Sequence, residues 1–595
     1  MKRIAFCLFA LIALALLREP ILEGRSFAIH SLYRSEPWRS MRPAGVEVHD
    51  NGSGSDGTLT FYPRRRFTHE MLGRGRLPLW NPYLLGGLPF AADPHSALFY
   101  PFNLLYAFFS PERLLPLLAL LQLTLAGFFA CLFFRDLGLA DSAAFLGGIV
   151  FAMNPFFMTH LVNPTNVDSG IWLPAMLLSF RRAYLATMPS QRGYWLAWLA
   201  AAQAMSILGG FPQIMVFSTY ALLFYAISLV RWRGGKEVGW RRFAPLGIAL
   251  GGIFGGALLA GVLLLPLGEL AAQSARRTID YTFFSKVFVP VETFFMYLVP
   301  DFFGTPTRNF FGAFADATRG GVGGYIVWRN SFLENCGYTG VLPLFLLPFA
   351  FRGRGRGGRG YFLFLLLFAL GATLGTPLFR FCYHVMPGFK FSRICRIVFL
   401  YGFGMAGLSA IGWDRAMRGK DRGMRIVLLL TAFSVGGLLL FATARYGHPE
   451  VLSAWRARLD GISPGGAGSW GTRIAAYRLY LDRASGQLEA ITAGIRRFAL
   501  LGMAGASLLL LLCVPRLPRR LLTVCLLLLL VGDLLGTWGR YLTFQPEFYP
   551  ERKPASLAWL QAHAGIDRIA RFGAFREILP PNTPQVYHLH DMAGS

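Results

Sequence analysis

Residues 396–443 read RIVFLYGFGMAGLSAIG, then WDRAMRGKDRGMR, then IVLLLTAFSVGGLLLFAT. Two apolar runs of 17 and 18 residues therefore flank a short loop, 413–425, which holds five basic residues and two acids. A helix needs about 20 mostly apolar residues to cross a bilayer. Basic residues concentrate in the cytoplasmic loops of membrane proteins. This stretch therefore predicts two membrane-spanning helices joined by a cytoplasmic loop.

Apolar runs of this kind recur along the 595-residue chain, which is 54% hydrophobic and 15% charged. A soluble protein carries about 25% charged residues, so the composition excludes an ordinary soluble protein and a disordered one. The predicted fold class is an all-α polytopic membrane protein with extracytoplasmic loops. We expect about thirteen transmembrane helices, at 1–17, 113–134, 143–160, 171–187, 193–209, 213–230, 243–267, 336–351, 361–377, 396–412, 426–443, 498–514 and 521–538.

The net charge of +27 gathers in short loops. If the N-terminus is cytoplasmic, four loops lie inside the cell, and together they hold 17 basic residues against three acids. They are 231–242, 352–360, 413–425 and 515–520. This is the distribution that the positive-inside rule predicts. We therefore expect a multi-pass protein with a cytoplasmic N-terminus and an extracytoplasmic C-terminus, whose partner is the lipid bilayer and not nucleic acid.

The predicted spans divide the chain into membrane and outer segments. Residues 1–17 begin with Lys2-Arg3 and lack a small-residue cleavage site, so we interpret them as an uncleaved signal anchor. The segments that follow are a first extracytoplasmic loop with interfacial or re-entrant helices (18–112), transmembrane helices (113–267), a second large extracytoplasmic loop (268–335), transmembrane helices (336–443), an extracytoplasmic amphipathic segment (444–497), the last transmembrane helices (498–538) and the start of a C-terminal extracytoplasmic domain (539–595).

The outer segments are where we expect any chemistry. The cytoplasmic loops are too short for a nucleotide-binding domain, and the sequence contains neither a Walker A motif nor a Rossmann glycine fingerprint. The outer segments instead carry short motifs rich in Pro, Gly, Asn and aromatic residues. These motifs are Leu77–Asn103, Pro300–Gly304, Glu334–Gly340, Pro387-Gly388 with Arg393, Gly532–Leu534, Pro581-Asn582 and His590–Gly594.

In this order, these motifs resemble those of the YfhO-type bacterial membrane proteins, which are assigned to the GT-C class of polytopic glycosyltransferases. The resemblance implies a GT-C-like protein of the bacterial inner membrane. It would transfer a hexosyl or pentosyl group from a polyprenyl-phosphate-linked sugar to a glycan or other cell-envelope acceptor on the outer face. It also implies a soluble C-terminal outer domain, of which we expect this sequence to hold only the start. No cofactor is assigned, and a divalent metal ion stays open.

Sugar transfer to a hydroxyl requires a base for the acceptor and cations for the leaving phosphate. The resemblance implies a catalytic carboxylate in the first outer loop, and Asp56 matches it by position. We expect Asp301 and Glu334 to assist. Asp56 also lies in a glycine-rich stretch, where an Asp is typical of a turn. Ion pairing with Arg276 or Arg329 is the alternative for the two later acids.

Guanidinium groups bind phosphate through paired hydrogen bonds. The expected substrate-binding residues are Arg64, Arg65, Arg393, Arg396, Trp80, Asn81, Asp93 and His95. Each has an alternative: the arginines attract anionic lipid headgroups, the aromatic residues form an interfacial belt, and the Asp93/His95 pair caps a helix near Ser96. Asp168, in a short outer turn, either lines the same cavity or belongs to a plain polar loop.

The alternative function is a transporter or flippase of a lipid-linked glycan, because buried acids and spans broken by Gly or Pro also suit transport. A transporter needs ionisable groups near the middle of the bilayer, whereas an outer-face enzyme needs them at the rim. Most of the predicted spans lack acids at their centre, which favours the enzyme. A scaffold for envelope assembly is the third reading.

Overall fold

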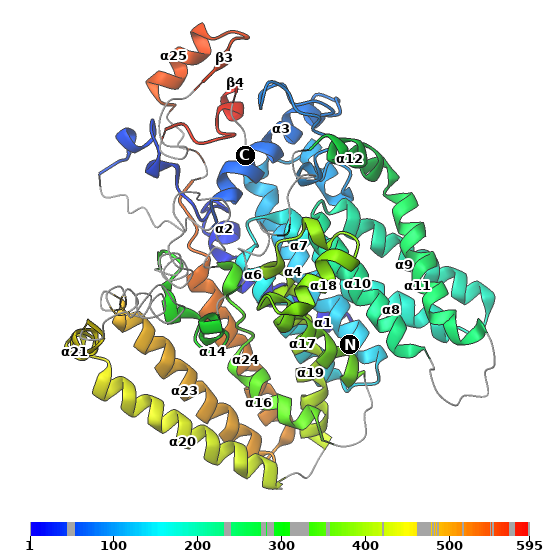
Figure 1. The fold of residues 1–595 in the computed structure, drawn as a ribbon, viewed down its shortest axis with the longest axis vertical. Coiled ribbons are helices and arrows are strands. Elements are labelled where there is room, and N and C mark those ends of the chain that lie inside the picture. The colour runs from blue at the N-terminus through cyan, green and yellow to red at the C-terminus, as the bar shows by residue number, and fades with distance from the viewer. Residues whose placement is uncertain are drawn as a thin grey trace. The chain divides into compact units, whose positions relative to one another are not determined.

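The computed structural model describes most of the chain and forms two compact units (Figure 1). Unit 1 comprises Met1–Phe129, His160–Ile279 and Leu542–Ser595, and unit 2 comprises Ala130–Thr159 and Asp280–Tyr541. The residues that the structure describes are 2–44, 54–230, 240–274, 281, 289, 291–309, 333–352, 358–418, 422–460, 478, 481, 484, 487–514, 517–547, 549, 553–570 and 578–592.

The described residues are mostly helical, and the strands are only two residues long. Seven helical segments are long and apolar enough to cross a membrane, so this is a multi-pass membrane protein. They are α4 (Pro111–Asp136), α5 running into α6 (Asp141–Thr159), α10 (Pro212–Leu229), η13 running into α19 (Ile394–Arg418), α20 (Arg422–Tyr446), α23 (Leu488–Leu511) and α24 (Arg519–Tyr541).

Two further helix pairs reach the length of a span only as bent pairs. The pair α11 (Ala244–Leu259) and α12 (Gly261–Gln273) bends by 81°, and the pair α17 (Arg359–Thr373) and α18 (Pro377–Val385) bends by 96°. Counting each pair as one span raises the number of candidate spans among the described residues to nine. A Pro at the start of α18 cannot continue the ladder of the preceding helix, which explains the break there.

The described residues thus contain fewer candidate spans than the thirteen predicted. Some of the expected spans form shorter helices: α1 (Lys2–Leu16), α8 (Leu173–Leu185) and α16 (Val341–Ala350) have 15, 13 and 10 residues. A straight helix rises about 1.5 Å per residue, so none of the three covers the roughly 30 Å of a hydrocarbon core. The prediction of a polytopic membrane protein is confirmed, with described residues that are mostly helical; the count of thirteen stays a prediction.

Unit 1 combines apolar helices, beginning with α1, with short polar elements. Besides α1, α8, α10, α11, α12 and most of α4, it contains α2 (Arg18–Leu22), η1 (Leu32–Arg34), η2 (Arg39–Met41), η4 (Gly57–Phe61), α3 (Tyr62–Gly73), η5 (Pro94–Ser96), η6 (Pro101–Ala107), α7 (Pro164–Gly170), α9 (Pro189–Leu208), η7 (Trp240–Phe243), α25 (Ala555–His563), β3 (Arg568–Ile569), η14 (Pro584–Tyr587) and β4 (His590–Asp591). β3 and β4 pair in parallel, Arg568 opposite His590.

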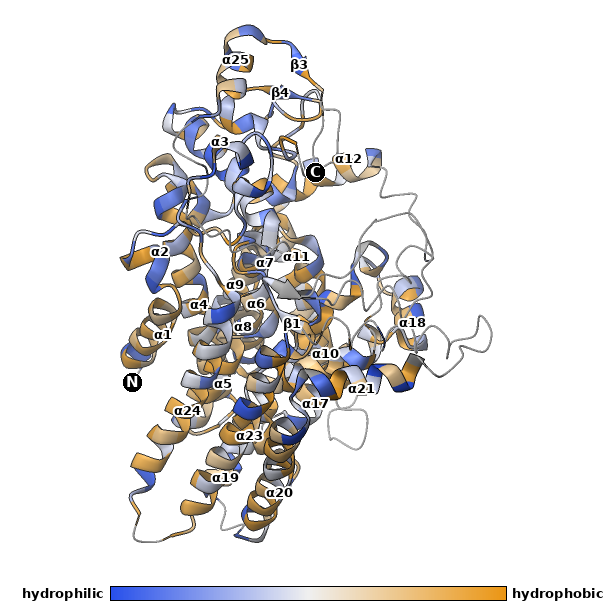
Figure 2. Ribbon diagram, turned by 90° about the vertical axis from the view of Figure 1, so that its left-hand side faces the viewer, coloured by the Kyte–Doolittle hydropathy of each residue, from blue (hydrophilic) through white to orange (hydrophobic). Residues whose placement is uncertain are grey.

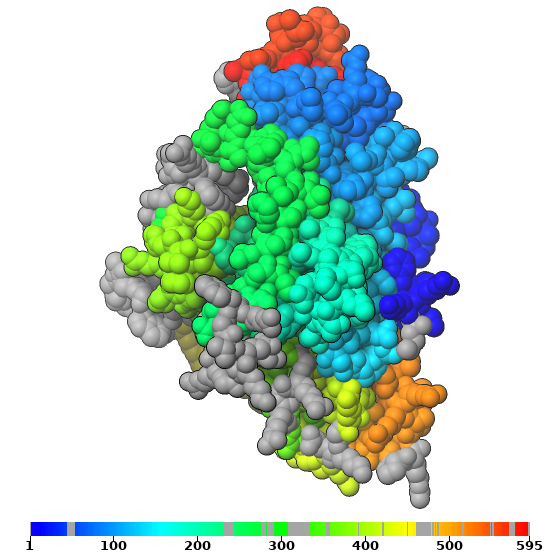
Figure 3. All heavy atoms as spheres, turned by 90° about the vertical axis from the view of Figure 1, so that its right-hand side faces the viewer, coloured from blue at the N-terminus to red at the C-terminus, as the bar shows by residue number. Residues whose placement is uncertain are grey.

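The two ends of the chain share one hydrophobic core within unit 1, which we call the terminal core. Its buried members are Leu32, Trp38, Leu59, Leu557, Leu579, Tyr587 and Leu589. A buried hydrogen bond from Asn81 Nδ2 to Gln585 Oε1, 2.8 Å long, joins the same two parts of the chain. In Figure 3 the red C-terminal residues accordingly lie against blue residues from the beginning of the chain. Residues far apart in sequence therefore build one compact region.

Unit 2 is organised around a central helix. Besides α5, α6, α16–α20, α23, α24 and the end of α4, it contains η9 (Val291–Phe294), α14 (Phe295–Leu298), η10 (Pro300–Phe303), β1 (Gly304–Thr305), β2 (Arg308–Asn309), η11 (Leu333–Asn335), η12 (Phe389–Phe391), η13 (Ile394–Ile397) and α21 (Pro449–Asp460). β1 and β2 form an antiparallel pair.

The central helix, α19 (Val398–Arg418), is buried along nearly its whole length. It packs against α5, α16 and α17. Its glycines allow this approach: a Cβ on Gly407 would lie 2.2 Å from the Phe362 ring, and one on Gly412 would lie 2.1 Å from the Leu346 carbonyl oxygen. The glycine-rich sequence of α19 thus reflects close helix packing.

At the periphery of unit 2, α20 leaves most of its apolar side chains uncovered. Only 17% of its apolar window is buried, although that window has a mean hydropathy of 2.3. Figure 2 shows α20, α23 and α24 as mostly hydrophobic. Exposed apolar surface on this scale is unfavourable in water and favourable in a hydrocarbon solvent. The periphery of unit 2 is therefore suited to lipid.

Candidate functional site

Asp56, the expected base, lies at the start of η4 in unit 1. Its side chain is exposed and forms no hydrogen bond or ion pair with any residue that the structure describes. The backbone on either side packs against the loop before α7: a Cβ on Gly57 would lie 3.0 Å from Cβ of Val162, and one on Gly54 would lie 3.8 Å from Cγ2 of Val162. Asp56 is therefore an accessible carboxylate beside the loop that leads into α7.

The arginines that follow Asp56 belong to helix α3, which starts with Tyr62 and Pro63. Arg64 donates from Nε to Asp93 Oδ2 over 3.0 Å, and both side chains are buried. The Arg64 guanidinium and the backbone N–H of His95 hold the pKa of Asp93 below its usual range, although burial alone would raise it. Arg64 and Asp93 therefore form a buried ion pair.

Arg65 is fully buried next to that ion pair. Its Nη1 donates to the carbonyl oxygen of Ser96, and its guanidinium carbon lies 5.7 Å from the centre of the Tyr106 ring. Nε and Nη2 have no hydrogen-bond partner among the described residues. Burying a guanidinium whose N–H groups lack hydrogen-bond acceptors lowers the stability of the folded protein. Arg65 therefore has unused capacity to bind an anion.

The Asp93/His95 turn forms a cap. Asp93 Oδ1 accepts a hydrogen bond from the His95 backbone N–H at 3.0 Å and so caps η5, which is the capping alternative considered for this pair. The His95 ring lies against Phe61 and Phe211. Within the part of the chain that the structure describes, no three His, Cys, Asp or Glu side chains are grouped closely enough to hold a metal ion.

Asp168, on the short helix α7, is the second buried acid of this region. It accepts a 2.7 Å hydrogen bond from Gln122 Nε2 on α4 and a further one from Tyr100, whose hydroxyl also accepts from Trp172 Nε1 at 3.2 Å. Burial raises the pKa of Asp168 to about 7, while Gln122, Arg65 and Tyr100 act to lower it. This carboxyl thus exchanges its proton near neutral pH.

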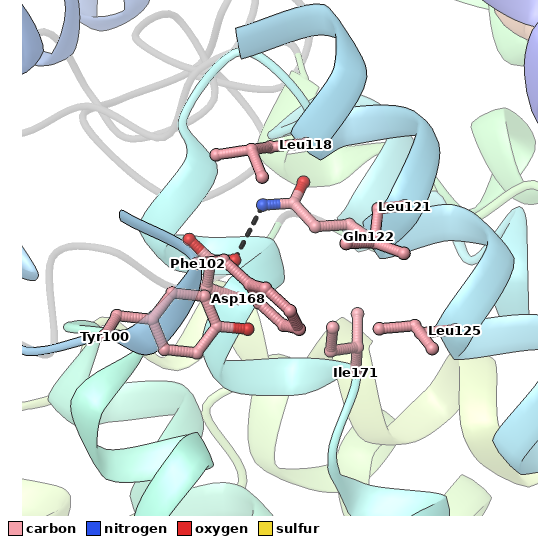
Figure 4. A pocket seen from close by; sticks show the side chains of 8 residues that line it. All are labelled: Tyr100, Phe102, Leu118, Leu121, Gln122, Leu125, Asp168 and Ile171. Carbon is pink, nitrogen blue, oxygen red and sulfur yellow. Dashed lines mark hydrogen bonds between the residues drawn. The ribbon is translucent and has the colours of Figure 1, made fainter. Parts of the chain in front are cut away.

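A narrow crevice opens at Asp168 (Figure 4). Its lining residues are Tyr100, Phe102, Leu118, Leu121, Gln122, Leu125, Asp168 and Ile171. In this conformation it has no room for a water molecule. The Gln122 amide points at the carboxylate across an otherwise apolar wall. The crevice therefore shields Asp168 from bulk solvent.

We call Arg64, Arg65, Asp93, Tyr100, Gln122 and Asp168 the Asp168 cluster. Its charged groups interact with one another: Arg65 acts on both Asp93 and Asp168. Two cations and two acids thus lie in one buried region of unit 1. The exposed Asp56 belongs to the same unit, and its neighbour Gly57 packs against the loop before α7. Sequence reasoning did not find Gln122, although a single Gln within the apolar run of α4 is a signal for it.

Trp80 and Asn81, also expected to contact substrate, differ in exposure. Trp80 is 54% exposed, and its ring covers the backbone of Gly87, where a Cβ would lie 2.3 Å from the ring. Asn81 is fully buried: it donates to Gln585 and its Oδ1 accepts from the Tyr83 backbone N–H at 3.0 Å. Asn81 thus has a clear structural role in joining the two ends of the chain.

The other two predicted acids lie in unit 2, and arginines pair with both. Glu334 accepts from Arg396 Nε at 2.9 Å and from Arg393 Nη1 at 3.3 Å. Asp301 pairs with Arg540 at 2.9 Å; burial raises its pKa and Arg540 opposes this. The expected ion pairing of these acids is therefore present, with partners other than the ones considered. Those two, at positions 276 and 329, lie outside the described residues.

None of the known family models matches this sequence, and no curated protein matches it either. Three solved structures of GT-C glycosyltransferases are similar. ArnT from Cupriavidus metallidurans, bound to undecaprenyl phosphate, has a TM-score of 0.43 and 14% identity over 90% of this chain and 76% of its own. The arabinofuranosyltransferase AftD from Mycobacteria has a TM-score of 0.35 and 14% identity, over 68% of this chain and 24% of its own. The Archaeoglobus fulgidus oligosaccharyltransferase, in the apo form, has a TM-score of 0.40 and 12% identity, over 100% of this chain and 64% of its own.

Proposed function

We propose that the chain is a membrane glycosyltransferase of the GT-C class, which transfers a sugar from a polyprenyl-phosphate donor to an acceptor in the cell envelope. The observation that carries the proposal is the presence in unit 1 of an accessible carboxylate, Asp56, together with a buried guanidinium, Arg65, two nitrogens of which have no hydrogen-bond partner among the described residues. The motif resemblance supplies the class of reaction, and the lipid-facing helices suit a donor with a long apolar tail.

Asp56 is assigned as the base. In the transfer, the acceptor hydroxyl oxygen bonds to the anomeric carbon of the sugar while the bond from that carbon to the phosphate oxygen breaks. The hydroxyl proton goes to the Asp56 carboxylate, and the polyprenyl phosphate leaves with the electron pair of the broken bond. An exposed carboxylate meets a bulky acceptor without rearrangement of the core, and geometry is the first requirement of a general base.

Arg65 is assigned to the leaving phosphate. Arg64 is neutralised by Asp93, whereas two nitrogens of Arg65 have no partner among the described residues. Donors held in place in a dry site stabilise a developing charge more than they do in water. Because Arg65 is fully buried, donor binding must move the side chains that cover it. The assisting role of Asp301 and Glu334 stays a prediction, although each is paired with arginine in unit 2.

Two features among the described residues support the transporter alternative: the two bent helix pairs, and buried acids within candidate spans, of which Asp533 is the most buried. Asp533, on α24, pairs with Arg497 of α23 at 3.2 Å. However, both of its carboxylate oxygens accept from the Tyr338 hydroxyl at 2.7 Å, and Oδ2 also accepts from the Val341 backbone N–H at 2.9 Å. These bonds fix the start of α16, so Asp533 has a structural role that transport does not require. We therefore favour the enzyme.

The test is a transfer assay with the full chain in lipid nanodiscs. A panel of radiolabelled polyprenyl-phosphate hexoses and pentoses is offered with extracted envelope glycans, and labelled glycan is counted. We expect Asp56→Asn to lower the rate by about 100-fold or more, as for loss of a general base. The matched control is Asp567→Asn, another exposed acid of unit 1, which should transfer at the wild-type rate.

Transfer that survives Asp56→Asn unchanged would remove Asp56 from the mechanism. A wild-type chain that moves labelled lipid across a vesicle membrane, but labels no glycan from any donor, would overturn the enzyme in favour of the transporter.

A further inference from the structure

A second concave site lies in unit 1, outside the Asp168 cluster. It is an open pocket of about 330 Å³, and the described residues that line it are Tyr33, Arg34, Arg39 and Arg42. All three arginines are exposed. Its volume is at the lower end of the range for small-molecule sites. Three cations converging on one pocket, with no carboxylate among its described lining, make it a strongly basic feature. We call it the arginine pocket.

The backbone that carries the arginine pocket is firmly held. Leu32 and Trp38, which lie within the same stretch, are buried in the terminal core, where Trp38 contacts the rings of Tyr549 and Tyr587. The backbone N–H of Leu579 also donates to the Glu36 carbonyl oxygen at 2.6 Å. Anchoring from both sides presets the positions from which the arginines project. A preset site loses less entropy when a ligand binds.

Two of the guanidinium groups differ in how they are held. Arg39 donates from Nε and Nη2 to the carbonyl oxygen of Arg34, with the Nε contact at 3.0 Å, which fixes its planar head and leaves Nη1 for another acceptor. Arg42 forms no hydrogen bond or ion pair with any residue in the described ranges. The pocket therefore offers both an oriented donor and an uncommitted one.

We propose that the arginine pocket binds a phosphate monoester. A phosphate monoester carries about −1.5 to −2 charges at neutral pH, so it matches a pocket with three cations better than a carboxylate does. Guanidinium forks bind phosphate oxygens through paired, charge-assisted hydrogen bonds. Tyr33 borders the pocket with its hydroxyl already donated to Glu547 at 2.7 Å, so it contributes an aromatic wall.

The phosphate has two chemical sources, a soluble phosphate ester or the headgroup of an anionic lipid. The proposal needs no sugar transfer, so it stands or falls separately from the proposed function. Binding to the arginine pocket is measured directly, without donor or acceptor.

The experiment uses the full chain in nanodiscs of phosphatidylcholine only, at low salt. Isothermal titration calorimetry measures the binding of inorganic phosphate and of glycerol 3-phosphate, with acetate as the carboxylate comparison. The test variant is Arg39→Gln with Arg42→Gln. The matched control is Arg74→Gln with Arg76→Gln, which removes two exposed arginines of unit 1 that do not line the pocket. Thermal unfolding of each variant in the same nanodiscs checks the fold.

We expect saturable phosphate binding by wild type, weakened about tenfold or more in the test variant and unchanged in the control, since charge-assisted bonds are lost. Acetate should bind at least tenfold more weakly than phosphate. Replacing part of the phosphatidylcholine with phosphatidic acid identifies the source. If phosphatidic acid weakens the binding of soluble phosphate to wild type, and this competition disappears in the test variant, the pocket binds lipid headgroups; if it does not weaken it, the pocket binds a soluble ester. Equal affinity of wild type and test variant, no saturable binding, or equal affinity for acetate would each overturn the proposal.

Discussion

Asp56 and Asp168 are both carboxylates of unit 1, yet their surroundings give them opposite properties. Asp56 is exposed and without a partner among the described residues, whereas Asp168 is 3% exposed and hydrogen-bonded to Gln122. Burial disfavours the charged form of an acid and raises its pKa. One acid is thus open to an acceptor, and the other can hold or release a proton near neutrality inside the protein.

The raised pKa of Asp168, about 7, makes a prediction about stability. In the unfolded chain an Asp loses its proton near pH 4, so between about pH 4 and 7 the native state binds more protons than the unfolded state. The free energy of unfolding therefore falls as the pH rises through this window. Asp168→Asn, which stays neutral, should raise the melting temperature by roughly 2–4 °C at about pH 8 and change it little at about pH 4.

Thermal unfolding in nanodiscs at the two pH values measures this difference. Asp567→Asn serves as the control, since that exposed acid should show no pH-dependent effect on stability. An equal shift for Asp168→Asn at both pH values would contradict the raised pKa.

At the scale of the elements, the η5 turn and the start of α10 meet at a single glycine. Gly210 has a φ of +85°, and a Cβ there would lie 2.1 Å from the carbonyl oxygen of Pro94. The neighbouring Phe211 donates its N–H to Ser169 Oγ at 3.0 Å. Gly210 therefore lets α10 approach both the Asp93 turn and α7, which positions the Asp168 cluster.

Gly210→Ala should destabilise unit 1 through two separate costs, the left-handed backbone and the clash with Pro94. Gly138→Ala isolates the first cost, because Gly138 has a φ of +86° but open space around a Cβ. We expect Gly138→Ala to cost about 1–2 kcal/mol and Gly210→Ala at least twice that amount. The free energy of unfolding in denaturant measures both, and an equal loss would show that the contact with Pro94 yields easily.

Elements with long apolar runs are those that the sequence predicts best. The expected spans 213–230 and 521–538 correspond to α10 and α24 within a few residues at either end. The span expected at 243–267 is instead broken, since α11 ends at Leu259 and α12 leaves at 81°. A hydropathy average over a window contains no information on the direction of the helix axis, so it does not predict bends of this kind.

The candidate site is harder to predict than the spans. Asp56 and the α3 arginines follow one another in sequence, but Arg64 pairs with Asp93, 29 residues away, and Gln122 with Asp168, 46 residues away. Such pairs depend on tertiary packing, which a single sequence does not reveal. The sequence thus points to candidate residues, whereas their partners emerge only from the structure.

At the scale of the whole molecule, Trp38 is the largest side chain of the terminal core and is fully buried. Removing a buried aromatic ring costs about 3–5 kcal/mol through lost contacts and a cavity. Trp38→Ala should therefore speed amide hydrogen exchange in residues 578–592 as well as in residues near position 38. Trp559→Ala is the control, since that ring is 61% exposed. Unchanged exchange in 578–592 would mean that the C-terminal residues are held by other contacts.

The hydrogen bond from Ser26 to the carbonyl oxygen of Gln545 spans 519 residues of chain. A ribosome adds about 5–20 residues per second, so Ser26 leaves it on the order of half a minute to two minutes before its partner does. Throughout that time Leu32 and Trp38 have no core to enter. The early polar segment must therefore be kept from misfolding until residues 545–589 have been synthesised, which makes their synthesis the step at which this region can mature.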